Sequence, residues 1–297
     1  MAIEVKPLHP AFGAVVTGVD LAAGDELTRE IEAAIGQYGL LLFRNMPLDD
    51  EALTRFGNRF GPMQNLSAKA NVPSPIALIT NIDEDGKLLP KDAAMRRQND
   101  ANCLWHIDSS YLSPRATYSY LNARIVTSTG GETEYCDTRV AWDALTAEQR
   151  ARIENVTCDH SIIHSRRLIG YDMSNDFHRP LPSIRRKLVE HHTPSGRKSM
   201  LIASHVEAVE GMSYEEARAL IDELVEIASA PERVYSHRWA VGDLLMWDNR
   251  CVLHRGKPYA QYDEIRDLRS VRNDDVNDNG VVLGEKDHAN LAAVNAG

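Results

Sequence analysis

The chain has 297 residues, of which 43% are hydrophobic and 26% are charged, the composition of a globular protein large enough to bury a core. Its 33 Lys and Arg against 43 Asp and Glu give a formal net charge of −10. This acidity disfavours nucleic acid as a partner, because no extended basic stripe offsets it. The short basic pairs at 96–97 and 166–167 are typical of a solvated face or of the rim of an anion site.

Neither a signal peptide nor a membrane helix is expected. The opening residues MAIEVKPLHP contain no apolar stretch of signal-peptide length. The longest strongly apolar run, residues 39–43, is far shorter than the roughly 18 residues that a membrane span requires. The four cysteines have neither a CxxC pair nor regular spacing, which favours reduced thiols. We therefore expect a cytoplasmic protein with no membrane partner.

Helices and strands alternate in the N-terminal part. We expect a β segment at 14–21, a helix at 27–38, a strand at 39–45 and a helix at 50–60 that Gly61-Pro62 closes. Residues 63–104 are rich in Pro, Asn, Asp and Gly and are predicted as a long loop. Loops of this length inside a compact domain are usually functional or disordered.

From residue 105 onward the pattern is mostly β. Strands are predicted at 118–126, 130–137, 186–192 and 198–204, with a longer β stretch at 233–256 and helices at 146–156 and 213–229. Ser213 and Glu216 have the spacing of a capping box. The sequence thus predicts a mainly β fold with flanking helices and a jelly-roll core. We expect one domain over residues 1–272, followed by a polar C-terminal tail over 273–297.

Two histidines and one aspartate are the candidate metal ligands. His106 and Asp108 are two residues apart, so both side chains leave the same face of an extended segment. His254, which follows an apolar strand, is the candidate third ligand. Two imidazoles and one carboxylate leave positions open on an octahedral ion, as in non-haem Fe(II) oxygenases. The His-x-Asp pair alone is a weak signal in a chain with 11 histidines, and a lone histidine is more often structural.

Three arginines follow the last of these histidines. Arg266, Arg269 and Arg272 lie just beyond it along the chain, and a guanidinium beside a metal suits the far carboxylate of a dicarboxylic acid. On a strand, Arg272 and Ser270 share the face of Arg266, whereas Arg269 points the opposite way. A surface ion pair is the alternative for any one of them.

Several motifs in order along the chain resemble the taurine/dichlorophenoxyacetate dioxygenase family. They are WHIDSSY (105–111), GGETEYCD (130–137) and GDLLMWDNRCVLHRG (242–256). The segments GAVVTGVDL (13–21) and LFR (42–44) are similar to that family's opening, and the likeness extends over residues 8–272. WDNRCVLHRG and SGRK (195–198) are most similar to the dichlorophenoxyacetate branch.

The resemblance implies a double-stranded β-helix of cupin-like type and an Fe(II)- and 2-oxoglutarate-dependent dioxygenase. His106, Asp108 and His254 would bind the iron, and Thr133 and Arg266 would hold the C5 carboxylate of 2-oxoglutarate. With O2, such an enzyme hydroxylates a small anionic substrate and releases succinate and CO2. The dichlorophenoxyacetate branch implies an aryloxyacetate-type carboxylate that is cleaved to a phenol and glyoxylate.

The chain departs from the family at the substrate end. A second arginine, four residues after the co-substrate arginine, holds the substrate anion in the family, and Ser270 stands there instead. The loop 63–104 is similar to the family's lid, and the resemblance favours a homo-oligomer. The candidate substrate-binding residues are therefore Lys69, Lys87, Trp105, His192, Arg269 and Arg272.

Three alternatives stay open. Within the same chemistry, the substrate is a taurine-like or other alkylsulfonate, or an unrelated small carboxylate. A non-catalytic, cupin-like metal- or ligand-binding protein needs the metal ligands but neither Thr133 nor Arg266. A zinc hydrolase with the same three ligands needs no O2.

Overall fold

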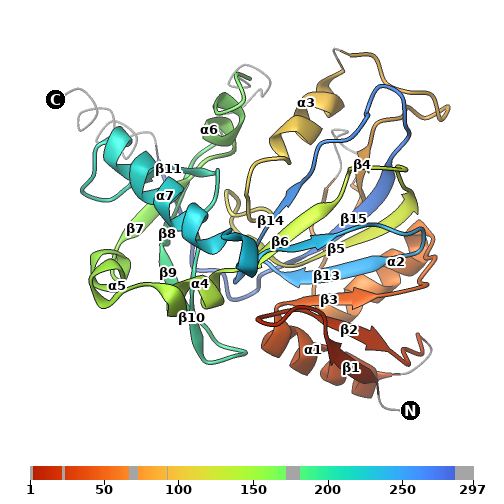
Figure 1. The fold of residues 1–297 in the computed structure, drawn as a ribbon, viewed down its shortest axis with the longest axis horizontal. Helices are drawn as coiled ribbons and strands as arrows, with labels where there is room; N and C mark the ends of the chain where they lie inside the picture. Colours follow the sequence, from red (N-terminus) through yellow and green to blue (C-terminus); the bar gives the residue numbers. More distant parts are fainter. Residues whose placement is uncertain (1–2, 22–23, 67–72, 92, 172–180, 285–297) are drawn as a thin grey trace.

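A seven-stranded sheet forms the base of the fold in this computed structural model, which describes residues 3–21, 24–66, 73–91, 93–171 and 181–284 (Figure 1). All neighbouring strands are antiparallel except β2 and β3, which are parallel. In spatial order the strands are β1 (Glu4–Pro7), β2 (Ala14–Thr17), β3 (Leu40–Phe43), β13 (Leu244–Asp248), β5 (Ala116–Ile125), β15 (Asp267–Asp274) and β4 (Ala77–Thr80).

A second, antiparallel sheet packs against the inner face of the first. Its strands, in spatial order, are β12 (Tyr235–His237), β6 (Thr133–Asp137) and β14 (Val252–Gly256). Leu42 and Trp247 of the large sheet share one buried hydrophobic cluster with Tyr135 and Val252 of the small one. Two facing sheets, antiparallel apart from the β2–β3 pair, share a common core and confirm the predicted mainly β, jelly-roll architecture.

Two helices cover the outer face of the large sheet (Figure 1). They are α1 (Asp25–Tyr38) and α2 (Asp50–Gly57), and the short 3-10 helix η1 (Asn58–Phe60) continues α2. Ile31 of α1 and Phe56 of α2 are buried against the sheet, where the ring centroids of Phe56 and Phe43 lie 5.7 Å apart. Asp49 caps α2 by accepting a hydrogen bond from the Ala52 N–H, which satisfies an otherwise free amide at the helix start.

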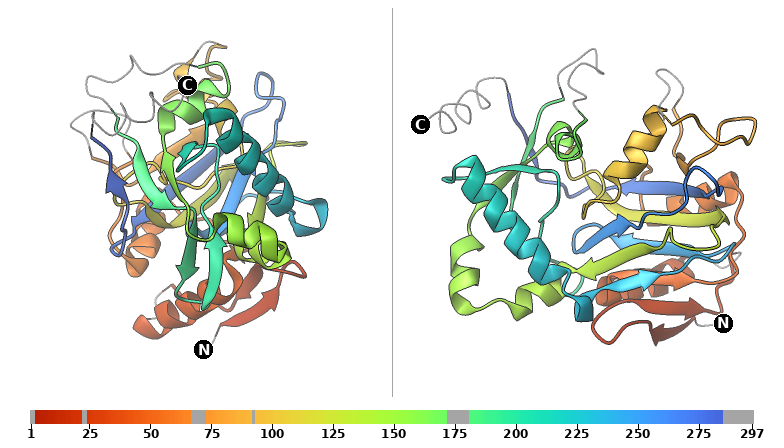
Figure 2. Two further views of the ribbon diagram at one scale, coloured as in Figure 1. Left: turned by 90° about the vertical axis from the view of Figure 1, so that its left-hand side faces the viewer. Right: turned by 45° about the horizontal axis from the view of Figure 1, so that its top comes forward.

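The middle of the chain, together with a short strand near its C-terminal end, forms a lobe beside the two sheets (Figures 1 and 2). Its four-stranded sheet contains β11 (Val206–Val209), β7 (Thr157–His160), β8 (Ile184–Lys187) and β16 (Val281–Val282), and its hairpin contains β9 (Val189–His192) and β10 (Arg197–Met200). Its helical parts are α4 (Thr138–Ala144), α5 (Ala147–Ile153), α6 (Ile162–Arg167), α7 (Tyr214–Ala228) and η2 (Pro231–Arg233). Ser213 and Glu216 form the predicted capping box of α7.

The predicted loop 63–104 contains two elements. These are β4, which pairs with β15, and α3 (Ala94–Ala101), whose C-terminal end lies beside the cavity described below.

His160 ends β7 and His164 belongs to α6, so the four-residue spacing of these histidines spans the end of a strand and the start of a helix. In the described ranges, no helix has the length and apolar character needed to cross a membrane.

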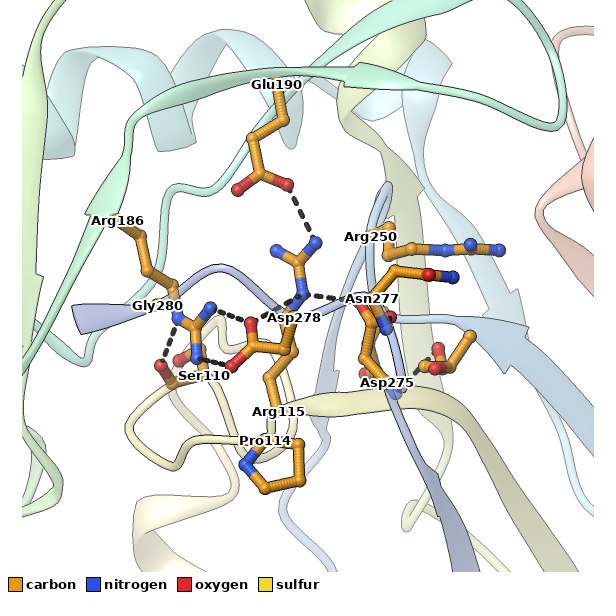
Figure 3. Close-up of polar contacts among 12 residues, drawn as sticks. Ser110, Pro114, Arg115, Arg186, Glu190, Arg250, Asp275, Asn277, Asp278 and Gly280 are labelled. Carbon is orange, nitrogen blue, oxygen red and sulfur yellow. Dashed lines mark hydrogen bonds and ion pairs between the residues drawn. The ribbon is translucent and has the colours of Figure 1, made fainter. Parts of the chain in front are cut away.

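Residues 273–284 differ from the predicted tail, because they are packed into the domain. Asn273 is fully buried, and its Oδ1 accepts a hydrogen bond from the Tyr120 hydroxyl at 2.8 Å. Asp275 accepts from Arg115 Nε at 3.0 Å, and Asp278 pairs with Arg186 (Figure 3). The acidic residues of this segment are therefore counter-ions of buried arginines and not a solvated tail. Residues 285–297 lie outside the described residues.

Candidate metal centre and its cavity

The two candidate histidine ligands are joined through their backbones. His106 precedes β5 and His254 lies on β14, and the two form an isolated antiparallel bridge. The His106 N–H donates to the His254 carbonyl at 2.9 Å, and the His254 N–H donates to the His106 carbonyl at 3.0 Å. Their ring centroids are consequently 4.1 Å apart.

Asp108 completes the triad on the same side of this bridge. Its carboxylate oxygens lie 3.9 Å from His106 Nε2 and 3.7 Å from His254 Nε2. One ligand atom from each of the three residues can be chosen so that all lie within 4.8 Å of one another. All three side chains are buried.

The protonation states suit a metal ligand set. Burial lowers the pKa of His106 and holds that of His254 well below its usual value, so both imidazoles are neutral at pH 7. Burial alone would raise the pKa of Asp108, but the nearby guanidinium of Arg272, with a contribution from the hydrogen bond of Ser119, lowers it to about 2. The centre therefore offers two neutral nitrogen donors and one carboxylate.

The orientation of the donors fits a divalent transition metal. His106 Nδ1 lies 2.7 Å from the Leu104 carbonyl, which can only accept, so Nδ1 carries the proton and Nε2 keeps its lone pair. His254 Nδ1 is buried without a hydrogen-bond partner among the described residues. Two nitrogens and one carboxylate on one face match the donor set of non-haem iron sites and leave further coordination positions open.

A cavity of about 250 Å³ opens in front of the triad. Its lining includes the three triad residues, and Thr133 and Arg266 belong to the same lining. The remaining lining residues are Ile79, Asn99, Asp100, Asn102, Cys103, Leu121, Trp247, Gly256, Lys257, Pro258, Tyr259, Gln261, Ser270 and Arg272.

Thr133 and Arg266 present two kinds of donor to this cavity. Arg266 is buried and has no carboxylate partner in the described part of the chain. The carbonyl of Gly131 fixes its guanidinium, accepting from Nε at 3.2 Å and from Nη2 at 3.0 Å. Thr133 Oγ1 accepts the indole N–H of Trp239 at 3.0 Å, so its own proton is free to donate elsewhere. A buried guanidinium without a counter-ion is a binding site for an anion.

Arg269 and Arg272, the two arginines of β15, lie on opposite faces, as the strand alternation predicts. Arg272 and Ser270 line the cavity, and Arg272 Nη2 lies 2.9 Å from Asp108 Oδ1. Arg269 instead forms ion pairs with Asp267 on its own strand and with Asp50 of α2. Only Arg272 of this pair is in reach of a ligand in the cavity.

The remaining candidate substrate residues lie elsewhere. Lys87 is exposed in a turn, and its backbone N–H donates to Asp83. Trp105 is buried beneath the guanidinium of Arg255, 4.6 Å from its ring centroid, and is outside the cavity lining. Lys69 falls outside the described residues.

His192 belongs to a second buried cluster, together with Asp248 and Cys251. His192 Nε2 is 3.0 Å from Asp248 Oδ2, and Arg250 binds both oxygens of that carboxylate at 2.8 and 2.6 Å. Burial holds the pKa of the Cys251 thiol well above its usual value. A protonated thiol and a carboxylate already bound by a guanidinium do not suit a metal ion, so this cluster fixes the turn between β13 and β14 instead.

Sequence reasoning missed two polar residues behind the triad. Asn249 lies in the motif WDNRCVLHRG without a role of its own there, and Ser119 lies within the apolar-looking strand β5. Both are fully buried, and both are hydrogen-bonded to Asp108. No local pattern could have identified Ser119, since its role depends on a residue that the fold brings opposite it.

Comparison with known proteins agrees with this geometry. Residues 4–272 match the model of the family described as "Taurine catabolism dioxygenase TauD, TfdA family". A 2,4-dichlorophenoxyacetate dioxygenase dependent on alpha-ketoglutarate, from Cupriavidus pinatubonensis, is 41% identical over 95% of this chain and 100% of its own length. A (S)-phenoxypropionate/alpha-ketoglutarate dioxygenase from Sphingobium herbicidovorans is 36% identical over 87% of this chain and 90% of its own.

Solved structures agree as well. The crystal structure of AAD-2 in complex with Mn(II) and N-oxalylglycine superposes with a TM-score of 0.85 at 35% identity, covering 93% of this chain and 98% of that one. A taurine dioxygenase from Burkholderia xenovorans, 22% identical with a TM-score of 0.76, shares the fold. The triad, the cavity and these relationships lead to one conclusion: the chain belongs to the TauD/TfdA family of dioxygenases.

Proposed function

We propose that the protein is an Fe(II)- and 2-oxoglutarate-dependent dioxygenase that hydroxylates an aryloxyacetate-type carboxylate and so cleaves it to a phenol and glyoxylate. One observation carries the proposal. Two neutral imidazoles and an ionised carboxylate converge in the same cavity as a buried guanidinium, Arg266, that lacks a carboxylate partner in the described ranges. The relatives named for 2,4-dichlorophenoxyacetate and (S)-phenoxypropionate support the substrate class.

Each side chain has a defined task. His106, Asp108 and His254 would hold the iron, while Thr133 and Arg266 would bind the C5 carboxylate of 2-oxoglutarate through one hydroxyl and the guanidinium. Bound iron, together with 2-oxoglutarate and O2, would supply the chemistry that oxidises a substrate carbon and releases succinate and CO2. The protein contributes orientation and protection from water.

The charge of the cavity favours a substrate with one negative charge. Three cationic side chains, Arg266, Arg272 and Lys257, face two carboxylates, Asp100 and Asp108, which leaves the lining with a net charge of +1. A divalent ion and a 2-oxoglutarate dianion cancel each other, so one positive charge remains. A monocarboxylate neutralises it, whereas a zwitterion such as taurine brings no net charge.

The rest of the lining suits an aromatic ether. Ile79, Leu121, Trp247, Pro258 and Tyr259 give the cavity apolar and aromatic surface beside its cationic groups. Such surface binds an aryl ring by burying it from water. Because Ser270 occupies the position of the family's second arginine, we assign the substrate carboxylate to Arg272. A homo-oligomeric state and a cytoplasmic location stay predictions from the sequence.

A substrate panel tests the proposal. Aryloxyacetates, alkylsulfonates and simple carboxylates are each supplied with Fe(II), 2-oxoglutarate and O2, and phenol, sulfite and succinate are measured. We expect phenol and succinate in a one-to-one ratio with aryloxyacetates, and no phenol from the Asp108→Ala variant. Asp263→Ala, which removes an exposed carboxylate outside the cavity lining, is the matched control and should keep activity. Sulfite release in place of phenol would assign the enzyme to sulfonates, and product formation without O2 would exclude a dioxygenase.

A further inference from the structure

A buried hydrogen-bond chain lies directly behind the carboxylate of Asp108. Asn249, in the turn between β13 and β14, is fully buried, and its Oδ1 is 3.2 Å from the Asp108 backbone N and 3.1 Å from Trp247 Nε1. Both of these neighbours are N–H groups, which can only donate. The oxygen of the Asn249 side chain must therefore be the atom that faces them, and its NH2 group must point the other way.

The direction of the next hydrogen bonds follows from this orientation. Asn249 Nδ2 lies 2.8 Å from Ser119 Oγ, so the amide donates and the hydroxyl accepts. Ser119 has one proton, and its other polar neighbour is Asp108 Oδ2 at 2.8 Å. The hydroxyl consequently donates to the carboxylate.

We propose that Asn249 and Ser119 are positioning residues for the metal: together they set the orientation of the Asp108 carboxylate and so the affinity of the site for a divalent ion. The inference rests on the proposed function only in taking Asp108 as a metal ligand. Asn249 fixes the backbone of this residue, and Ser119 fixes one of its carboxylate oxygens. The other oxygen is within hydrogen-bond distance of Arg272 Nη2, at 2.9 Å. With one donor on each oxygen, rotation of the carboxylate breaks at least one of these contacts.

Asn249 connects the two segments that carry the ligands with each other and with β5. Asn249 belongs to the turn that leads into β14 and His254, it binds the segment of Asp108, and its backbone N–H donates to the Thr117 carbonyl of β5 at 2.8 Å. A shift of this turn would therefore move both ends of the triad. Groups that orient metal ligands in this way typically contribute 10–100-fold to metal affinity.

Binding of Mn(II) to the full-length protein, measured by calorimetry without turnover, tests the Ser119 contact. We expect Ser119→Ala to raise the Kd for Mn(II) by about 10-fold or more. Ser119→Cys, which keeps the size and a weak donor, should give an intermediate value. Ser199→Ala is the matched control: its hydroxyl is also buried on a strand but has no hydrogen-bond partner in the described ranges. It should leave the Kd unchanged.

A double-mutant cycle tests whether Asn249 acts through Ser119. Asn249→Ala should weaken Mn(II) binding more than Ser119→Ala does, because it also releases the Asp108 backbone, and the double variant should lose no more than Asn249→Ala alone. Asn122→Ala, which removes a fully buried asparagine bound to the carbonyls of Met46 and Asp243, is the control for a general loss of stability. The Ser119 variants keep the test decisive if Asn249→Ala does not fold.

The outcomes separate this inference from the proposed function. A native Kd in Ser119→Ala and Ser119→Cys, or fully additive losses in the cycle, would overturn the positioning role even if the enzyme hydroxylates its substrate. Conversely, the proposed function alone is contradicted if the wild-type protein binds Mn(II) and the Ser119 variants bind it more weakly as predicted, but the wild-type protein oxidises no substrate. Failure of the wild-type protein to bind Mn(II) contradicts both.

Discussion

Three arginines at one strand, β15, have three different environments: Arg266 immediately precedes the strand, and Arg269 and Arg272 lie on it. Arg266 is fixed by the Gly131 carbonyl, Arg269 is neutralised by Asp267 and Asp50, and Arg272 faces the cavity beside Asp108. An arginine that already has carboxylate partners at the surface gains little from a bound anion, whereas one inside a cavity gains a charge-assisted contact. The function of each side chain is therefore decided by its partners rather than by its type.

This contrast gives a prediction for substrate binding. Arg272→Ala should raise the KM for an aryloxyacetate by about 10- to 100-fold, since a hydrogen bond between charged groups contributes about 1.5–3 kcal/mol. Because Arg272 also contacts Asp108 Oδ1, Fe(II) is kept saturating, and the KM for 2-oxoglutarate should then change far less. Arg269→Ala removes a guanidinium from the opposite face of the strand and should leave both KM values near those of the native enzyme. Equal effects of the two substitutions in steady-state kinetics would contradict our assignment.

Part of the candidate site could be predicted from residue spacing and part could not. The two-residue spacing of His106 and Asp108 and the alternation along β15 gave the correct faces, because a strand repeats every two residues. His192 and Trp105 are instead held by partners distant in the sequence, Asp248 and Arg255. Such partners are set by the packing of the sheets, which no local pattern contains.

At the scale of elements, the loop before β6 determines where the co-substrate residues lie. Gly131 has a φ of +72°, and a Cβ there would lie 2.9 Å from Thr127 Oγ1 and 3.2 Å from Arg266 Nε. The loop thus approaches Arg266 so closely that only glycine leaves room for the guanidinium. Its carbonyl then fixes the same side chain.

Gly131→Ala should therefore raise the KM for 2-oxoglutarate and lower the free energy of unfolding. Gly211→Ala is the matched control, because Gly211 has a similar φ of +77° but no atom within 4 Å of an added Cβ. Both variants carry the left-handed backbone strain of about 1–2 kcal/mol, so only the difference between them reports the contact with Arg266. An unchanged KM in Gly131→Ala, measured beside the control, would refute this role of the loop.

Long elements were predicted better than short ones. The helices α1 and α7 and the strand β5 are long, and their predicted positions agree with the structure. The short strand β3 also lies within its predicted range, because four successive apolar residues mark it. The short helices α3, α4 and α6 were missed, whereas α2 and α5, of similar length, were predicted. β16 was placed in the tail, since its pairing with β8 depends on contacts across the lobe.

At the scale of the whole molecule, the segment after β15 ties the lobe to the two-sheet core. Asp278 pairs with the buried Arg186 of β8, and Arg115 bridges Asp275 to Glu190 of β9 (Figure 3). Arg186 also donates to the Ser110 carbonyl at 2.9 Å, close along the chain to Asp108. The segment that its composition predicts to be a tail therefore connects the lobe to the core of the domain through buried ion pairs.

Removing one charge from this network should destabilise the protein strongly. Asp278→Asn leaves the Arg186 guanidinium buried without its counter-ion, and breaking a buried pair in this way costs about 3–5 kcal/mol. We expect a loss of this size in the free energy of unfolding in urea. The exposed carboxylate of Asp263 provides a comparison, since Asp263→Asn should have almost no effect. A loss below about 1 kcal/mol for Asp278→Asn, the size expected of a surface pair, would show that the network contributes little.

The buried histidines of the lobe predict that the protein loses stability in acid. Burial, with the nearby charges of Arg186 and Arg115, lowers the pKa of His160 to about 3. The unfolded chain binds a proton on this residue near pH 6.5, so the free energy of unfolding decreases as the pH falls below that value. Between pH 7 and pH 5 this histidine should cost about 2 kcal/mol of stability. Urea unfolding at both pH values should show a smaller pH dependence for His160→Gln than for the unsubstituted protein.

The backbone bridge between His106 and His254 has a consequence for how the site is loaded. Two main-chain hydrogen bonds already hold these residues face to face, so the spacing of the imidazoles does not depend on an ion. The centre is in this sense preformed, and little chain entropy is lost when an ion enters it. Protein stripped by a chelator should accordingly regain its ion on simple mixing, without a refolding step.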